Sequence, residues 1–333
     1  MEARLKDIAK ATGFSINTVS RALRLDRNIS EKTTSIIRAK AEELNYIPNA
    51  LASSMRSSKS GIIGVISADS GNPFFGEVVK GIEDKATKLG YQLLLGTTEE
   101  LLDKEEQLLK VFLSRRVDGL IVMPVFDNSP EHLEIYKRLG ETVPFIFAGR
   151  YLDGFKSHSI LHEDFSGQKA VFDYLFSQGH ERILYISGPD YVSNSKDRLD
   201  GMKASYLENG KIFDEDFAIK TNGQIEDGYA AVNQALNRGL DFTAVACFND
   251  LLAIGAMKSL GENDLSVPRD IEVFGYDNLL LSQFMQPSLS TVDVPRFKLG
   301  QSSMERLDKM IKRGGDYKEM VLPIRLIFRG STK

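Results

Sequence analysis

Apolar runs that alternate with amphipathic stretches dominate the chain from residue 62 onward. The runs are IIGVIS, YQLLLG, GLIVM, PFIFAG, RILYIS, TAVACF and IEVFGY, and the stretches between them have helical spacing. Near-continuous apolar strands that alternate with helices are typical of parallel sheets covered on both faces. The number of such units predicts an α/β fold with two doubly wound lobes that divide near residue 160.

The first 60 residues have a different texture and predict three short helices. The first ends at Gly13, the second begins after Ser15, and the third runs from about Glu31 to Leu44 after Ser30. Serine is a favoured N-cap residue, since its hydroxyl accepts a bond from a free amide of the first turn. The residues expected to face the core of this head are Leu5, Ile8, Ala9, Val19, Ala22, Leu23, Ile36, Ile37, Ala41 and Leu44. Spacing alone supports equally a DNA-reading helix-turn-helix and an ordinary three-helix bundle.

Charge is distributed unevenly between these two parts. Residues 1–60 hold eleven Lys or Arg and six Asp or Glu, a net charge of +5. The whole chain carries −4, so the remaining residues carry −9. A basic head on an acidic body is expected when only the head meets phosphate, although a chance fluctuation of this size is common.

The sequence also indicates the cellular compartment in which the protein works. One cysteine, Cys247, excludes an internal disulfide framework and suits a reducing cytosol. The N-terminus has no apolar run with a small-residue cleavage site, and no stretch reaches the roughly 20 apolar residues of a membrane span. We therefore expect a cytoplasmic protein without a membrane partner.

Polar and aromatic side chains follow the apolar runs. Ligands of parallel α/β sheets bind beyond the carboxyl ends of the strands, so these positions are candidate binding residues. They include Asp69 and Asn72 after the first run, Arg150 after PFIFAG, and Asp277 after IEVFGY. Planar groups that bind pairs of hydroxyls, together with phenyl rings that stack on C–H faces, indicate a polyol ligand.

The sequence resembles the LacI/GalR family of bacterial regulators over essentially its whole length. The head carries LKDIAKATGFSINTVSRAL, NISEKTTSII and AEELNYIPNALA in the family's order and spacing. The core carries NPFF at 72–75, R-x-x-G at 198–201, FND at 248–250, GYDN at 275–278 and PSLSTV at 287–292. The resemblance implies a helix-turn-helix head and a core like a periplasmic sugar-binding protein.

The resemblance also implies the domain limits. We expect a helix-turn-helix domain at 1–48 and a hinge helix with linker at 49–60. The N-terminal lobe is expected at 61–159 plus 292–322, and the C-terminal lobe at 160–291 plus 323–333. Crossovers between the lobes are expected near residues 160, 290 and 322, where they would act as hinges.

DNA contacts are expected from two helices. A recognition helix reads base edges with side chains near its N-terminus, where Asn17 can pair with adenine, Arg21 with guanine and Ile16 with a thymine methyl. The hinge helix would enter the minor groove with Met55 as a wedge, or Met55 would pack only on a partner subunit. Ser53 stands where the family usually has a basic residue. The full expected contact set is Leu5, Ser15, Ile16, Asn17, Thr18, Ser20, Arg21, Asn28, Tyr46, Asn49, Ala52 and Met55.

The expected effector contacts come from both lobes. They are Asp69, Asn72, Phe74, Phe75, Arg150, Asp164, Arg198, Asn249 and Asp277. For Asp69 and Asp164 the sequence leaves open whether they line the pocket or stabilise a turn. For Asp250 it leaves open a pocket role or a helix-capping role. Gly149 stands where many family members have Asp, which argues against a simple hexose.

Two other classes of protein compete with this interpretation. An enzyme is disfavoured because the chain has no G-x-S-x-G, no P-loop and no G-x-G-x-x-G after its first strand. The cluster His158, His162, Glu163 and Asp164 does not have zinc-site spacing, and we interpret it as an incidental surface cluster. His132 and His180 lie apart from it in the sequence and are expected to be surface residues. A transport-type solute-binding protein would need a signal peptide and would lack the head.

The sequence therefore predicts a transcription regulator, most simply a repressor, with no catalytic residue, metal or cofactor. Its expected partners are a pseudo-palindromic operator, a small effector that is a sugar or sugar derivative, and a second copy of the chain. Whether the effector induces or co-represses, and whether a protein co-regulator binds, stays open.

Overall fold

The computed structural model describes residues 3–46, 59–315 and 317–333. The chain forms two compact units, residues 1–60 and residues 61–333, which are described separately. No helix in the described ranges has the length and apolar character needed to cross a membrane.

The first unit is a three-helix head built from α1 (Leu5–Thr12), α2 (Ile16–Leu23) and α3 (Glu31–Glu43). Gly13 ends α1 in the left-handed region, with φ of 76°. Ser15 and Ser30 cap the next two helices by accepting bonds from the amides of Thr18 and Thr33. The predicted helices and caps are therefore confirmed.

The core of the head consists of Ile8, Val19, Ala22, Ile37 and Ala41. Ile36 was expected in this core, but its side chain is 44% exposed. Adjacent helical positions point about 100° apart, so Ile36 and Ile37 cannot both face the same core centre.

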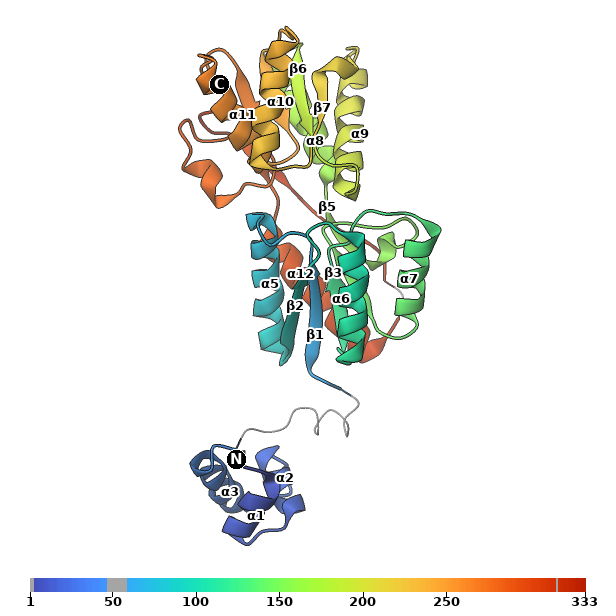
Figure 1. Ribbon diagram of the computed structural model, residues 1–333, viewed down its shortest axis with the longest axis vertical. Helices are drawn as coiled ribbons and strands as arrows, with labels where there is room; N and C mark the ends of the chain where they lie inside the picture. The colour runs from blue at the N-terminus through green and yellow to red at the C-terminus, as the bar shows by residue number, and fades with distance from the viewer. Residues whose placement is uncertain (1–2, 47–58, 316) are drawn as a thin grey trace. The chain divides into compact units, whose positions relative to one another are not determined.

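The second unit contains two parallel-sheet lobes (Figure 1). The sheet of the first lobe has the order β11-β5-β4-β3-β1-β2. Its strands are β1 (Ile62–Ser67), β2 (Gln92–Thr97), β3 (Gly119–Val122), β4 (Phe145–Ala148), β5 (Ser159–His162) and β11 (Met320–Leu322). One face is covered by α5 (Pro73–Leu89) and α12 (Arg296–Arg313), and the other by α6 (Leu102–Ser114) and α7 (Pro130–Gly140).

The sheet of the second lobe has the order β7-β6-β8-β9. Its strands are β6 (Ile183–Ser187), β7 (Ala218–Lys220), β8 (Ala244–Cys247) and β9 (Glu272–Phe274). Helices α8 (Asp164–Ser177) and α9 (Ser193–Glu208) cover one face, and α10 (Ile225–Asn237) and α11 (Asp250–Glu262) cover the other. All strand pairs in both large sheets are parallel, as the apolar runs predicted.

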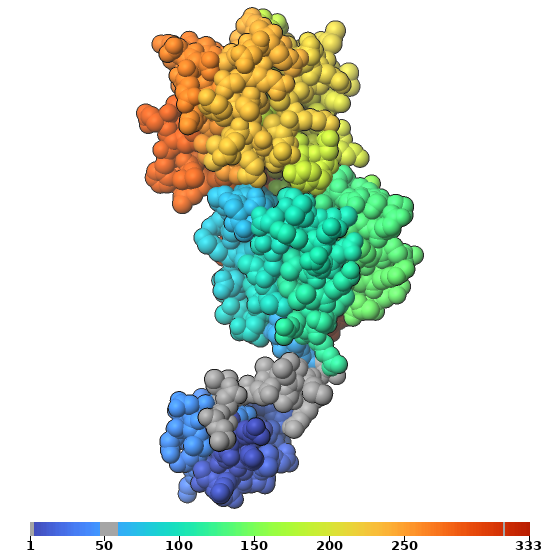
Figure 2. All heavy atoms as spheres, viewed as in Figure 1, coloured from blue at the N-terminus to red at the C-terminus, as the bar shows by residue number. Residues whose placement is uncertain are grey.

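The chain passes between the lobes three times, after His162, after Asp293 and after Leu322. The antiparallel pair β10 (Thr291–Asp293) and β12 (Arg325–Ile327) accompanies two of these crossings. The expected lobe boundary at residue 160 falls inside β5, which pairs along its length with β4 and β11 and so stays whole in the first sheet. Figure 2 shows the two lobes of the core as distinct masses that meet at a waist.

Candidate functional site

A pocket lies where the carboxyl ends of both sheets face each other. It contains about 660 Å³ of empty space, including the part that is open to solvent. Eight of the nine expected effector residues line it, and Asp164 does not. The lining residues are Asp69, Asn72, Phe74, Phe75, Glu100, Ala148, Gly149, Arg150, His162, Pro189, Val192, Asn194, Arg198, Asn222, Gly223, Gln224, Phe248, Asn249 and Asp277.

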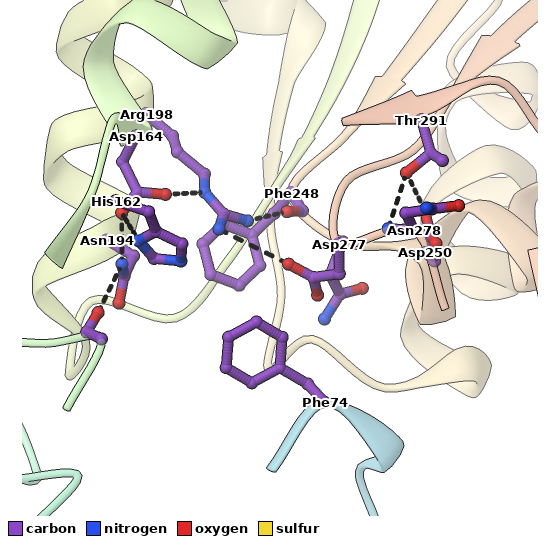
Figure 3. Close-up of polar contacts among 12 residues, drawn as sticks. Phe74, His162, Asp164, Asn194, Arg198, Phe248, Asp250, Asp277, Asn278 and Thr291 are labelled. Carbon is purple, nitrogen blue, oxygen red and sulfur yellow. Dashed lines mark hydrogen bonds and ion pairs between the residues drawn. The ribbon is translucent and has the colours of Figure 1, made fainter. Parts of the chain in front are cut away.

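Arg198 of α9 is the buried cation of the second lobe. Its Nε donates to Asp164 Oδ1 at 2.7 Å, and its Nη1 donates to the carbonyl of Phe248. The guanidinium carbon lies 4.4 Å from the centre of the Phe248 ring and 3.5 Å from that of Tyr276. These contacts from three elements fix the guanidinium plane against the pocket wall (Figure 3).

Asp164 begins α8, directly after the first crossing between the lobes, and lies behind the pocket wall. Its carboxylate accepts bonds from Arg198 and from Asn194 Nδ2, and its Oδ2 lies 3.0 Å from Nδ1 of His162. Burial raises the pKa of this carboxyl, but His162 and Arg198 outweigh that effect and hold it well below the ordinary value. Asp164 is therefore ionised and orients three pocket residues, which explains why it is absent from the lining.

Asp277 lies opposite Arg198 in the pocket wall, and the residue is 5% exposed. Its Oδ1 is 3.6 Å from Arg198 Nη2, too far for a good hydrogen bond. Among the described residues its carboxylate accepts no hydrogen bond. Burial raises the pKa of Asp277 to about 7, against the lowering effect of Arg198. This carboxylate is thus available to a ligand.

Arg150 follows β4 and is the buried cation of the first lobe. Its two terminal nitrogens donate to Glu100 at 2.8 Å and 2.7 Å, and Nη1 also donates to the carbonyl of Pro124 at 3.2 Å. The guanidinium lies 5.4 Å from the centre of the Phe75 ring. Glu100 was not predicted as a pocket residue, since it stands three residues beyond the end of β2 in a left-handed turn with φ of 57°.

Both expected amide residues cap helices at the pocket edge. Asn72 Oδ1 accepts from the amide of Phe74 at 2.9 Å, and Asn249 Oδ1 accepts from the amide of Leu252 at 2.8 Å. Asn249 Nδ2 also donates to the carbonyl of Gly223 at 2.9 Å. The cap role considered for Asp250 therefore belongs to Asn249.

Asp250 is a buried structural carboxylate. It accepts bonds from the amide of Leu279 and from the hydroxyls of Ser282 and Thr291, which tie down the chain after β9. Asp69 accepts from the amide of Gly71 at 2.7 Å and from Gln224 of the second lobe at 3.4 Å. It thus serves both a turn and the pocket rim.

The histidine interpretation from the sequence was wrong. His162 is 5% exposed and lines the pocket, and His132 is 1% exposed and bonds Glu105 at 2.8 Å. His180 is mostly buried and bonds Thr243. The position of His162 as the last residue of β5, by the same rule that selected Asp69, was the signal that could have found it. Among the described residues no group of His, Cys, Asp and Glu has a metal-binding arrangement.

In the head, the exposed side chains at the start of α2 include Asn17 and Ile16, the latter 53% exposed. Ser15 and Thr18 are joined by a hydroxyl bond of 2.9 Å, and Arg21 pairs with Asp26 at 2.9 Å. Of the other expected contacts, Leu5 and Tyr46 pack against the head core, Ser20 is half-buried, and Asn28 is exposed. Asn49, Ala52 and Met55 lie outside the described residues.

Comparisons with known proteins match both units. The family of "Bacterial regulatory proteins, lacI family" matches residues 4–49, and "Periplasmic binding proteins and sugar binding domain of LacI family" matches residues 60–329. The repressor PurR of Proteus mirabilis is 32% identical over 333 residues, covering 99% of this chain and 97% of its own. The ribose operon repressor of Escherichia coli K12 is 34% identical over 306 residues, covering 92% of each chain. A solved structure of the Lac repressor dimer bound to operator and the anti-inducer ONPF has a TM-score of 0.90 at 27% identity, covering 100% of this chain and 99% of its own.

Proposed function

This chain belongs to the LacI family of bacterial regulatory proteins, and from that premise we propose how its head and pocket act together. It is a DNA-binding transcriptional regulator whose effector controls repression. We propose that the effector binds between the two lobes, in the pocket formed by the strand ends.

The observation that carries this proposal is that both lobes contribute residues to the pocket lining. Asn72, Phe74 and Arg150 come from the first lobe, whereas Arg198 and Asp277 come from the second. A ligand that bonds both sets is bound more tightly when the lobes are closed than when they are open, so it shifts the equilibrium toward closure. The three crossings are the segments about which such a motion would occur.

A sugar or sugar derivative fits the lining best. Phe74 and Phe75 lie edge to face with ring centres 5.3 Å apart and offer apolar surface for C–H groups. Carboxylate, amide and imidazole groups next to them can bond several hydroxyls. One relative is named for a ribose operon, and the matched core family is described as sugar-binding, which supports a sugar.

The DNA-reading part of the proposal rests on α2. Asn17 and Ile16 are exposed at its N-terminus, the end that reads base edges in helix-turn-helix proteins. Nε of Arg21 donates to Asp26, and we propose that its terminal nitrogens donate to a guanine. We propose that two copies of the chain read a pseudo-palindromic operator, as the Lac repressor dimer on operator suggests.

The competing classes lack comparable support. The curated relatives are named repressors rather than enzymes or transport receptors, and the matched head has no role in a solute-binding protein. Because bacterial DNA lies in the cytoplasm, we propose that the chain acts there. The hinge helix with Met55 as a wedge stays a prediction.

Selection of operators from random DNA tests this function directly. Full-length protein should enrich a palindromic site, and a sugar from a metabolite panel should change its affinity for that site. An Asp277→Ala variant should bind the same site without responding to that sugar. Enrichment of no sequence, or a full response by the variant, would overturn the proposal.

A further inference from the structure

His162 lines the pocket, and its imidazole ring makes no hydrogen bond among the described residues. It is the last residue of β5, at the carboxyl edge of the first sheet, and is 5% exposed. Its neighbours in the pocket lining come from both lobes. An imidazole at this place is neither a surface group nor a part of the hydrophobic core.

One side of the ring faces the carboxylate of Asp164. Nδ1 lies 3.0 Å from Oδ2 of Asp164, and Asp164 is itself fixed by Arg198 and Asn194. The ring centre lies 6.2 Å from that of Phe74, with the planes tilted by 47°. This approach is a charge contact and not a hydrogen bond, so Nδ1 also has no hydrogen-bond partner among the described residues.

The other ring nitrogen has no such partner. Nε2 of His162 is buried, yet it makes no hydrogen bond among the described residues. A buried polar atom without a partner destabilises a protein, and one that faces a pocket can regain a partner from a ligand. The carboxylate of Asp277, also buried, accepts no hydrogen bond within the described ranges either. Figure 3 shows His162 and Asp277 on opposite sides of Phe74 and Phe248.

We propose that His162 is a specificity-determining effector contact whose Nε2 bonds a hydroxyl of a neutral polyol. This inference rests on the proposed function and names a residue and a ligand class for its pocket. A hydroxyl can both donate and accept, so it pairs with Nε2 whether the imidazole is neutral or protonated. The same ligand can donate a second hydroxyl to Asp277.

The charges around the pocket favour a neutral ligand over an anionic one. Arg150 is neutralised by the two-pronged contact with Glu100, and Arg198 by Asp164. No lysine lines the pocket, whereas Asp69, Glu100 and Asp277 do. A phosphate ester would therefore meet carboxylates without a free cation to balance its charge.

The ligand class is tested with the full-length protein and matched probes. Melting temperatures are measured with D-ribose, D-xylose, D-glucose and D-galactose, and with a phosphate ester of each. At least one neutral sugar should raise the melting temperature, because it binds only the folded state, and its phosphate ester should not. An equal or larger rise with the ester, or no rise with any neutral sugar, would overturn the class.

The role of His162 is tested by a thermodynamic cycle that combines removal of the His162 side chain with removal of single hydroxyls from the sugar. The dissociation constant of the sugar that binds is measured for wild type and His162→Ala, each with the parent sugar and its mono-deoxy analogues. Wild type should lose roughly three- to tenfold in affinity for one analogue, the usual strength of one hydrogen bond. His162→Ala should show a similar loss with the parent sugar and no further loss with that analogue.

A purely structural role would give another pattern. In that case His162→Ala would weaken all analogues by the same factor, and the inference would be wrong. His180→Ala, which removes a histidine of the second lobe outside the pocket lining, is the matched control and should bind every sugar as wild type does. If His162→Ala showed no loss of affinity that is specific to one hydroxyl, while the sugar still controlled operator binding, this inference would be overturned and the proposed function would stand.

Discussion

Replacing Asp277 with Asn should make the protein more stable and less responsive at the same time. Burial raises the pKa of Asp277 to about 7, compared with its ordinary 3.8. Asn has the same shape, carries no charge and tolerates the left-handed backbone at this position, where φ is 105°. The substitution therefore removes a buried charge without disturbing the turn.

The pH dependence follows from the direction of this shift. A carboxyl whose pKa is raised in the folded state contributes full stability below about pH 4, and that contribution is lost as the pH rises toward 7. The loss has an upper limit of about 4 kcal/mol, since one pKa unit corresponds to about 1.36 kcal/mol. Rearrangement around the ionised group reduces it, so we expect Asp277→Asn to gain about 1–3 kcal/mol at pH 8 and progressively less as the pH falls toward 4.

Differential scanning calorimetry of the ligand-free protein at several pH values measures this gain. A rise of roughly 2–6 °C in the melting temperature of the core is expected at pH 8 for a domain of this size. The same variant should bind the effector at least about tenfold more weakly, because a charged hydrogen-bond acceptor is lost. A variant that is less stable than wild type at pH 8, or a gain that does not change with pH, would refute this reasoning.

Three further substitutions test separate parts of the structure. Glu105→Ala should lower the free energy of unfolding in urea by about 3–5 kcal/mol, because it removes a buried carboxylate that accepts three hydrogen bonds; a loss below about 1 kcal/mol would contradict the assignment. Gly81→Ala should cost about 1–3 kcal/mol in the same assay, since its Cβ would lie 2.1 Å from the carbonyl of Phe297, whereas Gly76→Ala on the same helix meets no atom within 4 Å and should not destabilise. Asn17→Ala should weaken operator binding by about 1–3 kcal/mol in a gel-shift titration while thermal stability stays unchanged, because Asn17 is exposed; unchanged operator affinity would remove it from the reading surface.

The architecture could be predicted because its signals are local and repeated. Each apolar run marked a buried strand, and each serine before a helix marked a cap, as at Ser15 and Ser30. The rule that ligands bind beyond strand ends selected residues such as Asn72 and Asp277, which the fold brings to one pocket.

The contacts that were missed depend on pairings between distant segments. Glu100 lies in the pocket because it pairs with Arg150, fifty residues away in the sequence, and no spacing rule connects the two. Asp164 lies behind the wall because Arg198 and Asn194 of another helix bond it there. A pattern along the chain identifies which residues are polar, but tertiary contacts decide which of them face a ligand.

Histidines were misjudged for a related reason. His132 follows a cap residue in a polar stretch and reads as exposed, yet Glu105 of the neighbouring helix bonds it in the interior. A buried histidine needs a partner from elsewhere in the chain, and that partner is invisible to local analysis.

Control of operator binding by the pocket is the central claim, and fluorescence anisotropy with the selected operator measures it most directly. The operator dissociation constant is determined for wild type and Asp277→Asn, each with and without the neutral sugar that raises the melting temperature. At a sugar concentration that saturates only wild type, we predict at least about a tenfold change for wild type and a much smaller one for the variant, with equal operator affinities when the sugar is absent. An equal response from both proteins, or a wild type that binds the sugar without any change in operator affinity, would contradict the account.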